Sequence, residues 1–128
     1  MKTEPSEYSF ARLQKDGTTV WSGVMNPAAL RNIRAMKKGD EVIVYHTGDE
    51  RAAVGLAKVA SDPYAEPKRP NLPVADLAAV RPLKKPVTLA TVKSMPFFAD
   101  FVLVRQGRLS VMPVTDAQWA ELMRLAGE

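Results

Sequence analysis

The chain has 128 residues, of which 46% are hydrophobic; this is enough to bury one core and predicts a single domain over residues 1–128. It contains no cysteine, which excludes disulfides, thiolate metal sites and cysteine nucleophiles and favours a reducing compartment, the cytoplasm. The formal net charge is +4, a modest basic excess that permits binding to polyanions without requiring it.

The distribution of charged and apolar residues limits where this chain acts. Six Lys or Arg residues lie from Arg81 to Arg108, against a single acidic residue, Asp100. This segment is the expected electropositive surface, although a solvated face that only keeps the protein soluble has the same pattern. No apolar run reaches the ~18 residues of a membrane span, and residues 1–6 lack the apolar core of a signal peptide. We therefore expect neither membrane insertion nor secretion.

The first forty residues predict two helices separated by a strand. Residues 8–15 have apolar side chains at helical spacing, and residues 18–21 favour an extended chain. The next helix is marked most clearly, because Asn26 is a capping residue, Pro27 suits the first helical position and Gly39 suits the end.

The middle of the chain predicts a hairpin, a loop and a further strand. Residues 41–46 and 52–59 flank a turn-rich segment and predict two paired strands. Residues 61–73 hold four prolines and are expected to form a long surface loop. Residues 74–81 predict a strand, and residues 82–86 a connector.

The last forty residues predict helices around one more strand. A short helix is expected over 88–93, a helical turn over 97–104 and a strand over 109–114. Thr115 and Gln118 form a capping-box pattern that begins a terminal helix. The apolar face of that helix contains Trp119, Leu122, Met123 and Ala126.

These elements together favour an α+β fold, a small mixed barrel of short strands with helices inserted between them. A regular alternation of strand and helix is absent, and the sequence has no glycine-rich phosphate loop. A doubly wound α/β fold is therefore not expected.

The chemistry available for catalysis is sparse. His46 is the single histidine, and the carboxylates near it have no recognisable metal-binding spacing. Ser22 or Ser110 could approach His46 in space, but neither serine has the nucleophile-elbow pattern. We expect no catalytic residues, no metal and no cofactor, with His46 as a hydrogen-bonding residue in the structure or at a pocket rim.

Three segments carry candidates for binding. Trp21 precedes a Ser-Gly turn, so its indole either stacks on a planar base or packs in the core. Residues 2–5 supply an amine, a hydroxyl and a carboxylate suited to the polar edges of a base. Residues 105–111 combine two arginines that could engage phosphate with Ser110, which could face a pocket, although a salt-bridged turn has the same composition.

Taken in order, these segments resemble the EVE domain family. The resemblance covers nearly the whole chain and rests on residues 2–5 with 8–9, 21–24 with Asn26, 34–40, 45–47, 54–59, 86–89 and 105–114. It implies a PUA-like fold, a twisted, partly closed β-barrel with peripheral helices. It also implies a nucleic-acid-binding module that recognises a modified base in DNA or RNA, such as 5-methylcytosine or 5-hydroxymethylcytosine, without catalysis.

The resemblance also implies roles for particular residues. The base pocket would contain Thr3, Glu4, Trp21, Ser22, Asn26, His46, Leu109 and Ser110, with Trp21 as its aromatic wall. Backbone phosphates would be held by Arg31, Arg34 and Arg108. The partner would be DNA or RNA carrying a modified base, and the protein is expected to be a monomer.

This sequence departs from the family pattern at three places. Met1 directly precedes Lys2, where family members have a short apolar strand; residues 25–30 replace an arginine-rich stretch; and Gly107 stands where serine is common. These departures bear on base preference and phosphate contacts, not on the fold. Two alternatives stay open. One is an RNA-binding or RNA-cleaving protein similar to ASCH domains, with His46 and nearby Lys or Arg residues as catalytic groups, and the other is a module that binds a small nucleoside-like ligand.

Overall fold

The computed structural model describes residues 1–128 and contains six strands, five α-helices and one 3₁₀ turn. The strands are β1 (Lys2–Thr3), β2 (Thr18–Trp21), β3 (Glu41–His46), β4 (Ala52–Val59), β5 (Tyr64–Glu66) and β6 (Arg69–Thr88). The helices are α1 (Phe10–Asp16), α2 (Pro27–Arg34), α3 (Leu89–Ser94), α4 (Val102–Arg105) and α5 (Asp116–Leu125), with the 3₁₀ turn η1 over Pro96–Phe98. The fold is therefore mixed α+β, as expected.

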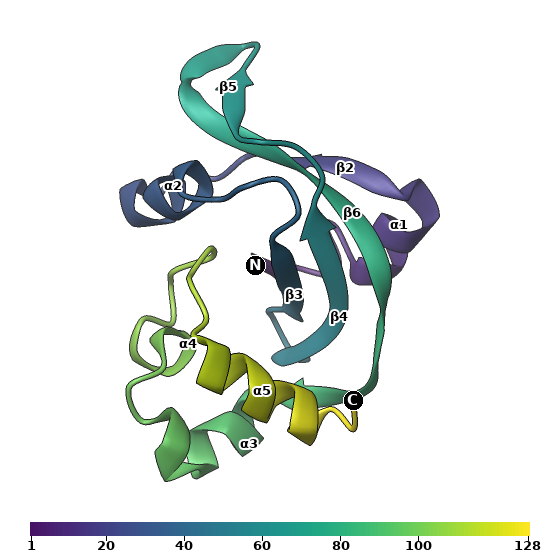
Figure 1. Ribbon diagram of the computed structural model, residues 1–128, viewed down its shortest axis with the longest axis vertical. Helices are drawn as coiled ribbons and strands as arrows, with labels where there is room; N and C mark the ends of the chain where they lie inside the picture. Colours follow the sequence, from purple (N-terminus) through teal and green to yellow (C-terminus); the bar gives the residue numbers. More distant parts are fainter.

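The six strands form one open sheet in the order β1-β3-β4-β6-β2, with β5 paired to β6. β1 runs parallel to β3, and the other neighbours are antiparallel. The 20-residue β6 curves through the molecule and pairs with β5, β2 and β4 (Figure 1). No ladder joins the edge strands β1 and β2.

The helix starts follow the capping residues in the sequence. The Asn26 side chain accepts hydrogen bonds from the Ala28 and Ala29 amides at the start of α2. Thr115 and Gln118 form the predicted capping box of α5. Both helix starts are thus confirmed, because each depends on contacts within four residues.

The predicted length of the second helix is wrong. α2 ends at Arg34 rather than near Gly39. The Lys37 amide donates to the Asp40 carboxylate, and the Gly39 amide donates to the Val59 carbonyl at 2.7 Å. These tertiary and side-chain partners replace the bonds that would continue the helix.

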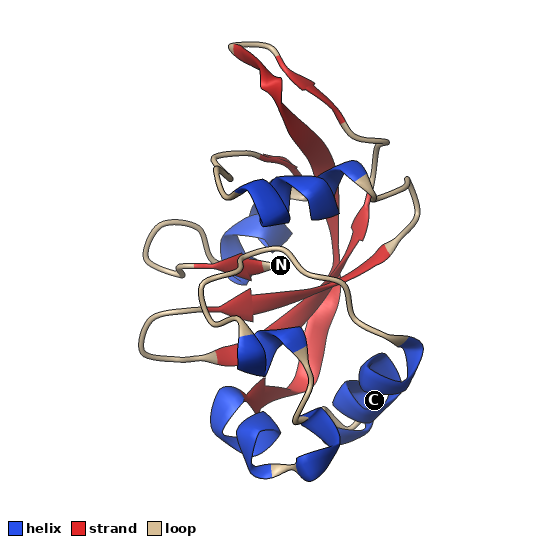
Figure 2. Ribbon diagram, turned by 90° about the vertical axis from the view of Figure 1, so that its left-hand side faces the viewer, coloured by secondary structure: helices blue, strands red, loops and turns tan.

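The proline-rich segment is a hairpin and not a loop. β5 and the start of β6 occupy most of residues 61–73, and Pro70 and Pro73 lie within β6. Prolines are tolerated there because this hairpin is at the edge of the sheet, where outward-facing amides need no partner. The hairpin projects beyond the body of the sheet (Figures 1 and 2).

Two further predictions from local composition are wrong. Residues 82–86 continue β6, with Pro82 opposite Gly55 and a register shift beside that pair. Residues 109–114 form no strand. Their carbonyls instead accept isolated bonds, from the Lys2 amide to Ser110 and from the Asn32 side chain to Val111.

The core has two parts, one on each side of the sheet. Alternate residues of β3 serve both, since Val42 and Val44 belong to one cluster and Ile43 and Tyr45 to the other. The first cluster contains Phe10, Leu13, Trp21, Ala29, Leu30, Ile33, Val42, Val44, Ala57, Val59, Ala75, Leu77, Leu109 and Val111. The second contains Ile43, Tyr45, Ala53, Leu56, Leu83, Val87, Val92, Phe98, Phe101, Leu122 and Ala126. None of the helices has the length and apolar character needed to cross a bilayer.

Candidate functional site

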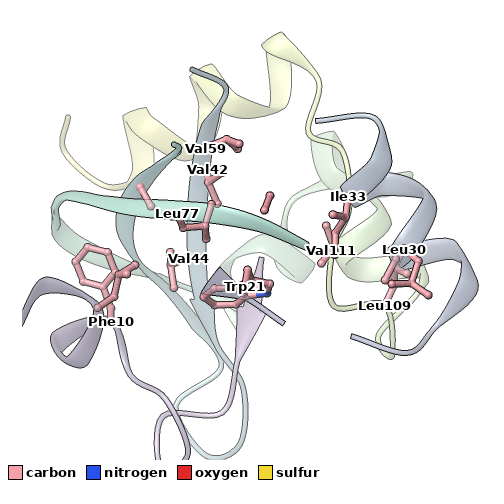
Figure 3. Packing of buried hydrophobic residues seen from close by; sticks show 14 residues of the cluster. Phe10, Trp21, Leu30, Ile33, Val42, Val44, Val59, Leu77, Leu109 and Val111 are labelled. Carbon is pink, nitrogen blue, oxygen red and sulfur yellow. The ribbon is translucent and has the colours of Figure 1, made fainter. Parts of the chain in front are cut away.

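Trp21 lies at the end of β2, opposite Ala75 of β6, and is buried to 8% exposure. It belongs to the first core cluster, between Phe10 on one side and Leu30 and Leu109 on the other (Figure 3). The sequence left core packing and base stacking equally open. In this structure most of the indole surface packs against protein.

Tyr8 is a site neighbour that the sequence reasoning missed. Its ring meets Trp21 edge to face, with centroids 6.4 Å apart and planes at 84°. Its carbonyl accepts a 2.6 Å hydrogen bond from Thr3 Oγ1, and its hydroxyl donates to Asp16 at 2.9 Å. The pKa of the Tyr8 hydroxyl is raised above its ordinary value, mainly by burial. A tyrosine directly before Ser9, the capping residue of α1, was the available signal in the sequence.

Glu4 is held within its own turn. Its carboxylate accepts from the Ser6 hydroxyl at 2.6 Å and from the Ser6 amide at 2.5 Å. The hydrogen bond from the Ser6 hydroxyl and then that from the Ser6 amide lower the pKa of Glu4. Glu4 is thus an ionised acceptor beside β1.

His46 lies at the end of β3 and is buried to 8% exposure. Its Nε2 accepts a 3.0 Å hydrogen bond from the Phe10 amide, so Nε2 carries no proton. Nδ1 therefore carries the proton and donates to the Glu50 carboxylate at 2.6 Å. Nε2 thus joins β3 to α1, Nδ1 binds the turn between β3 and β4, and neither nitrogen is free to act as a base.

Replacing His46 is expected to reduce stability through the Phe10 amide. His46→Ala leaves this buried donor without an acceptor, which costs about 1–3 kcal/mol. His46→Gln places an amide oxygen near the Nε2 position and should lose less than half as much. Urea denaturation of both variants tests this; equal losses would show that the hydrogen bond to Phe10 is not what His46 contributes.

The segment that follows Trp21 has no regular structure and is mostly exposed. Ser22 is exposed, and Gly23 has a φ of +79°, in the left-handed region that glycine favours. Met25 is 58% exposed. Asn26 is also exposed, with its side-chain oxygen engaged in capping α2. Val24 of this segment is partly buried and packs against the core cluster that contains Trp21.

Residues 105–111 are bound to the N-terminal strand. Lys2 Nζ donates to the Gly107 carbonyl at 2.9 Å, and the Lys2 amide donates to the Ser110 carbonyl at 2.8 Å. Partial burial lowers the pKa of Lys2. Leu109 is buried in the first core cluster, whereas Ser110 is half-buried and Arg108 exposed.

The cations predicted to contact phosphate lie in different surroundings. Arg31 and Arg34 are exposed on α2, and Arg34 donates to the Asn71 carbonyl at 3.3 Å. In the basic 81–108 segment, Arg81 pairs with Glu128, and Arg105 pairs with Asp100 at 3.5 Å. Two of the six cations there are thus partly neutralised.

The structure brings the predicted pocket residues together in two groups. Thr3 is in register with His46 and lies next to Glu4, while Trp21 and Leu109 share the first core cluster. Tyr8 links the groups, through its carbonyl to Thr3 and its ring to Trp21. No group of three or more His, Asp or Glu side chains has an arrangement that could hold a metal ion.

Two hollows lie near this region without including Trp21. A mostly apolar cavity of about 260 Å³ lies between β3, residues 111–114 and α5, with Lys2, Asn32, Tyr45 and Trp119 among its lining residues. A hollow of about 370 Å³ lies between α2 and the β5–β6 hairpin, where Arg34 and Tyr64 line it. Trp21 and Ser22 line neither of them.

Comparison with known proteins identifies relatives over the full length of the chain. The EVE domain model matches residues 1–125. Human thymocyte nuclear protein 1 is 28% identical over 139 aligned residues, which cover 89% of this chain; the chain spans only 62% of that protein's length.

Solved structures with the same fold include bacterial and human proteins. An NMR structure of a Rhodopseudomonas palustris protein is 36% identical, with a TM-score of 0.95 over 99% of this chain and 90% of that chain. Human THYN1 in complex with 5-methylcytosine-containing DNA is 26% identical, with a TM-score of 0.90 over 100% of this chain and 96% of that chain.

Proposed function

Because the chain belongs to the EVE domain family, we propose that it binds nucleic acid and recognises a modified base, with 5-methylcytosine in DNA as the first candidate. The observation that carries this proposal is its similarity to human THYN1 in complex with 5-methylcytosine-containing DNA. The similarity covers the whole chain at a TM-score of 0.90. It includes the segments around Trp21 and residues 105–111.

The base is held in a pocket that has Trp21 as its wall and Tyr8 as a second aromatic surface. Extruding a base from the duplex costs a few kcal/mol, and stacking on an aromatic ring contributes about 1–3 kcal/mol. The pocket edge consists of Thr3, Glu4, Ser22, Asn26, His46, Leu109 and Ser110. Since Trp21 is 8% exposed in the free protein, base entry requires the exposed segment after Trp21 to move outward, with Gly23 as its pivot.

Recognition occurs without bond chemistry. The two hydrogen bonds of His46 support this part of the proposal, because an imidazole engaged at both nitrogens is not available for proton transfer. RNA cleavage by the purified protein that is abolished in His46→Ala would contradict it and favour the ASCH-like alternative.

The finer fold assignment, a PUA-like and partly closed barrel, belongs to the same proposal. It is supported by membership of the EVE family and by the course of β6, which pairs with three other strands along its 20 residues. Register shifts in both the β3–β4 and β4–β6 ladders are of the kind that bend a sheet towards closure.

A salt-controlled titration tests the function. Matched oligonucleotides carry cytosine, 5-methylcytosine, 5-hydroxymethylcytosine or N6-methyladenine, as duplexes and as single strands, with RNA strands as a further arm. Burying one methyl group contributes about 0.8 kcal/mol, so we expect about fourfold preference for 5-methylcytosine over cytosine. Affinity should fall as salt rises.

Other outcomes of the titration are equally informative. Equal binding to all bases would reject the modified-base pocket and retain only backbone binding. Binding of a free nucleoside that is insensitive to salt and to polymer length would favour the small-ligand alternative.

A further inference from the structure

The β5–β6 hairpin has the properties of a contact arm beside the proposed base pocket. Trp21 is in register with Ala75, and β6 continues from there past the end of β2 into the hairpin (Figure 1). Leu72 packs against the core cluster that contains Trp21. The base of the hairpin is therefore fixed next to Trp21, while residues 67–71 at its outer end are exposed.

The hairpin is stiffened along its length. The Tyr64 hydroxyl donates to the Asp76 carboxylate at 2.6 Å, and the Asp76 amide donates to the Ser61 hydroxyl at 3.0 Å. Pro63, Pro67, Pro70 and Pro73 restrict the backbone. A stiff arm loses little conformational entropy on binding.

Cations on the hairpin and on α2 lie along one edge of the molecule, here called the rim, which consists of residues 22–39 and 67–75. Arg69 Nη1 lies 3.8 Å from Met25 Sδ, in the segment that follows Trp21. Arg34 reaches across to the Asn71 carbonyl of the hairpin, and both border the hollow of about 370 Å³. Arg69 thus lies beside the segment that borders the proposed pocket, and Lys68 precedes it in the chain at the outer end of the hairpin.

This rim carries an excess of positive charge, and three acidic residues border it: Asp40 and Asp62, which accept from the Lys37 and Lys38 amides, and Glu66. Residues 22–39 and 67–75 contain no Asp or Glu. They carry Arg31, Arg34, Lys37, Lys38, Lys68 and Arg69. None of these six is in an ion pair, unlike Arg81 and Arg105 of the basic segment at the other end of the sheet. Glu66, opposite Arg69 in register, is the nearest acidic residue along the hairpin.

We propose that the β5–β6 hairpin is a second contact arm for DNA, in which Lys68 and Arg69 hold the sugar-phosphate backbone flanking the recognised base. This proposal rests on the proposed function and adds a contact outside the pocket. Phosphate contacts position a duplex without reading its sequence. The arm therefore contributes to affinity and salt dependence, and it leaves the preference for the modified base unchanged.

The test compares Lys68→Gln/Arg69→Gln with wild type on a duplex that contains one 5-methylcytosine and on the same duplex unmethylated. Each lost phosphate contact lowers the slope of log affinity against log salt by about 0.9. We expect the double variant to lose nearly two units of slope and, at physiological salt, on the order of tenfold in affinity for both duplexes. The matched control, Lys85→Gln/Lys93→Gln, removes two exposed cations, one near the end of β6 and one on α3, and should match wild type. α3 lies at the end of the molecule opposite β5 (Figure 1).

The outcomes separate the arm from the pocket. If wild type prefers the methylated duplex and the double variant keeps the wild-type affinity and slope, the proposal that the hairpin contacts DNA is wrong and the proposed function stands. Loss of methyl preference in the double variant would also overturn the arm as a backbone contact. If wild type binds neither duplex, both proposals fall. A thermal melt shows whether the double variant folds. If it does not, the single variants replace it in the test, and each should lose about one unit of slope.

Discussion

Trp21→Ala is expected to destabilise the protein by about 3–5 kcal/mol, the range for removing a buried aromatic ring from a core. The ring is 8% exposed and contacts Tyr8 edge to face within the first core cluster. This loss is a large fraction of the 5–15 kcal/mol that typically separates folded and unfolded domains. Urea denaturation measures it, and a loss below about 1 kcal/mol would show that Trp21 is not a core anchor.

The burial of Trp21 changes how its binding role must be tested. From the sequence, Trp21→Ala is the natural variant for removing base stacking while leaving the fold intact; in the structure, it removes core packing as well. Trp21→Leu retains an apolar side chain and deletes the aromatic face. We expect it to fold and to lose about 5- to 150-fold in affinity for the methylated duplex, equivalent to the 1–3 kcal/mol of one stacked base.

The second tryptophan supplies the control. Trp119→Leu makes the same substitution on α5, at the second core cluster, away from the proposed pocket. Its DNA binding should equal that of wild type. A folded Trp21→Leu variant with wild-type preference for the methylated duplex would remove Trp21 from the pocket.

Gly55→Ala is expected to destabilise the protein by about 1–3 kcal/mol through overpacking, and Gly55→Val by more. A Cβ at Gly55 would lie 2.4 Å from ring atoms of Phe10, which is itself 4% exposed. The Phe10 ring cannot withdraw easily, because its backbone amide is bound to His46 Nε2. Thermal and urea unfolding report the change.

A double-mutant cycle shows whether the contact with Phe10 is the cause. Combining Gly55→Ala with Phe10→Leu should cost less than the sum of the single variants, because the smaller side chain relieves the overlap. Gly107→Ala is the matched control, since a Cβ there meets nothing within 4 Å and φ is not positive. It should change stability by less than about 0.5 kcal/mol. An additive cycle would show that Phe10 is not the obstacle at Gly55.

The candidate site was only partly predictable from the residues. Trp21 and His46 stand out in the sequence because the chain has two tryptophans and one histidine. Residues 105–111 stand out because two arginines flank a glycine shortly before Ser110. Tyr8 did not, because its importance comes from a carbonyl bonded to Thr3 and a ring against Trp21. Lys68 and Arg69 lie in a segment that the sequence predicts to be a loop. The sequence instead predicts the basic surface over residues 81–108, where more cations follow one another.

The sequence by itself determined the features whose physical causes lie within a few residues. Caps at Asn26 and Thr115 and the hairpin over 41–59 follow from local hydrogen bonds and from the turn residues between two apolar segments. Membership of the EVE family also follows from sequence alone, because it depends on the order of motifs along the chain.

Only the tertiary structure determined the conformation of segments in which local preference competes with contacts from elsewhere in the fold. β4 pairs with β6 on both sides of residues 83–86, at Gly55–Pro82 and at Ala53–Val87, which keeps this segment within β6. α2 ends at Arg34, and the Lys37 and Gly39 amides bond to Asp40 and Val59 instead. The burial of Trp21 and the two occupied nitrogens of His46 arise in the same way, from contacts with Tyr8, Phe10 and Glu50. Local propensities differ by at most about 1 kcal/mol for most residues, so a single buried contact or hydrogen bond from elsewhere in the fold outweighs them.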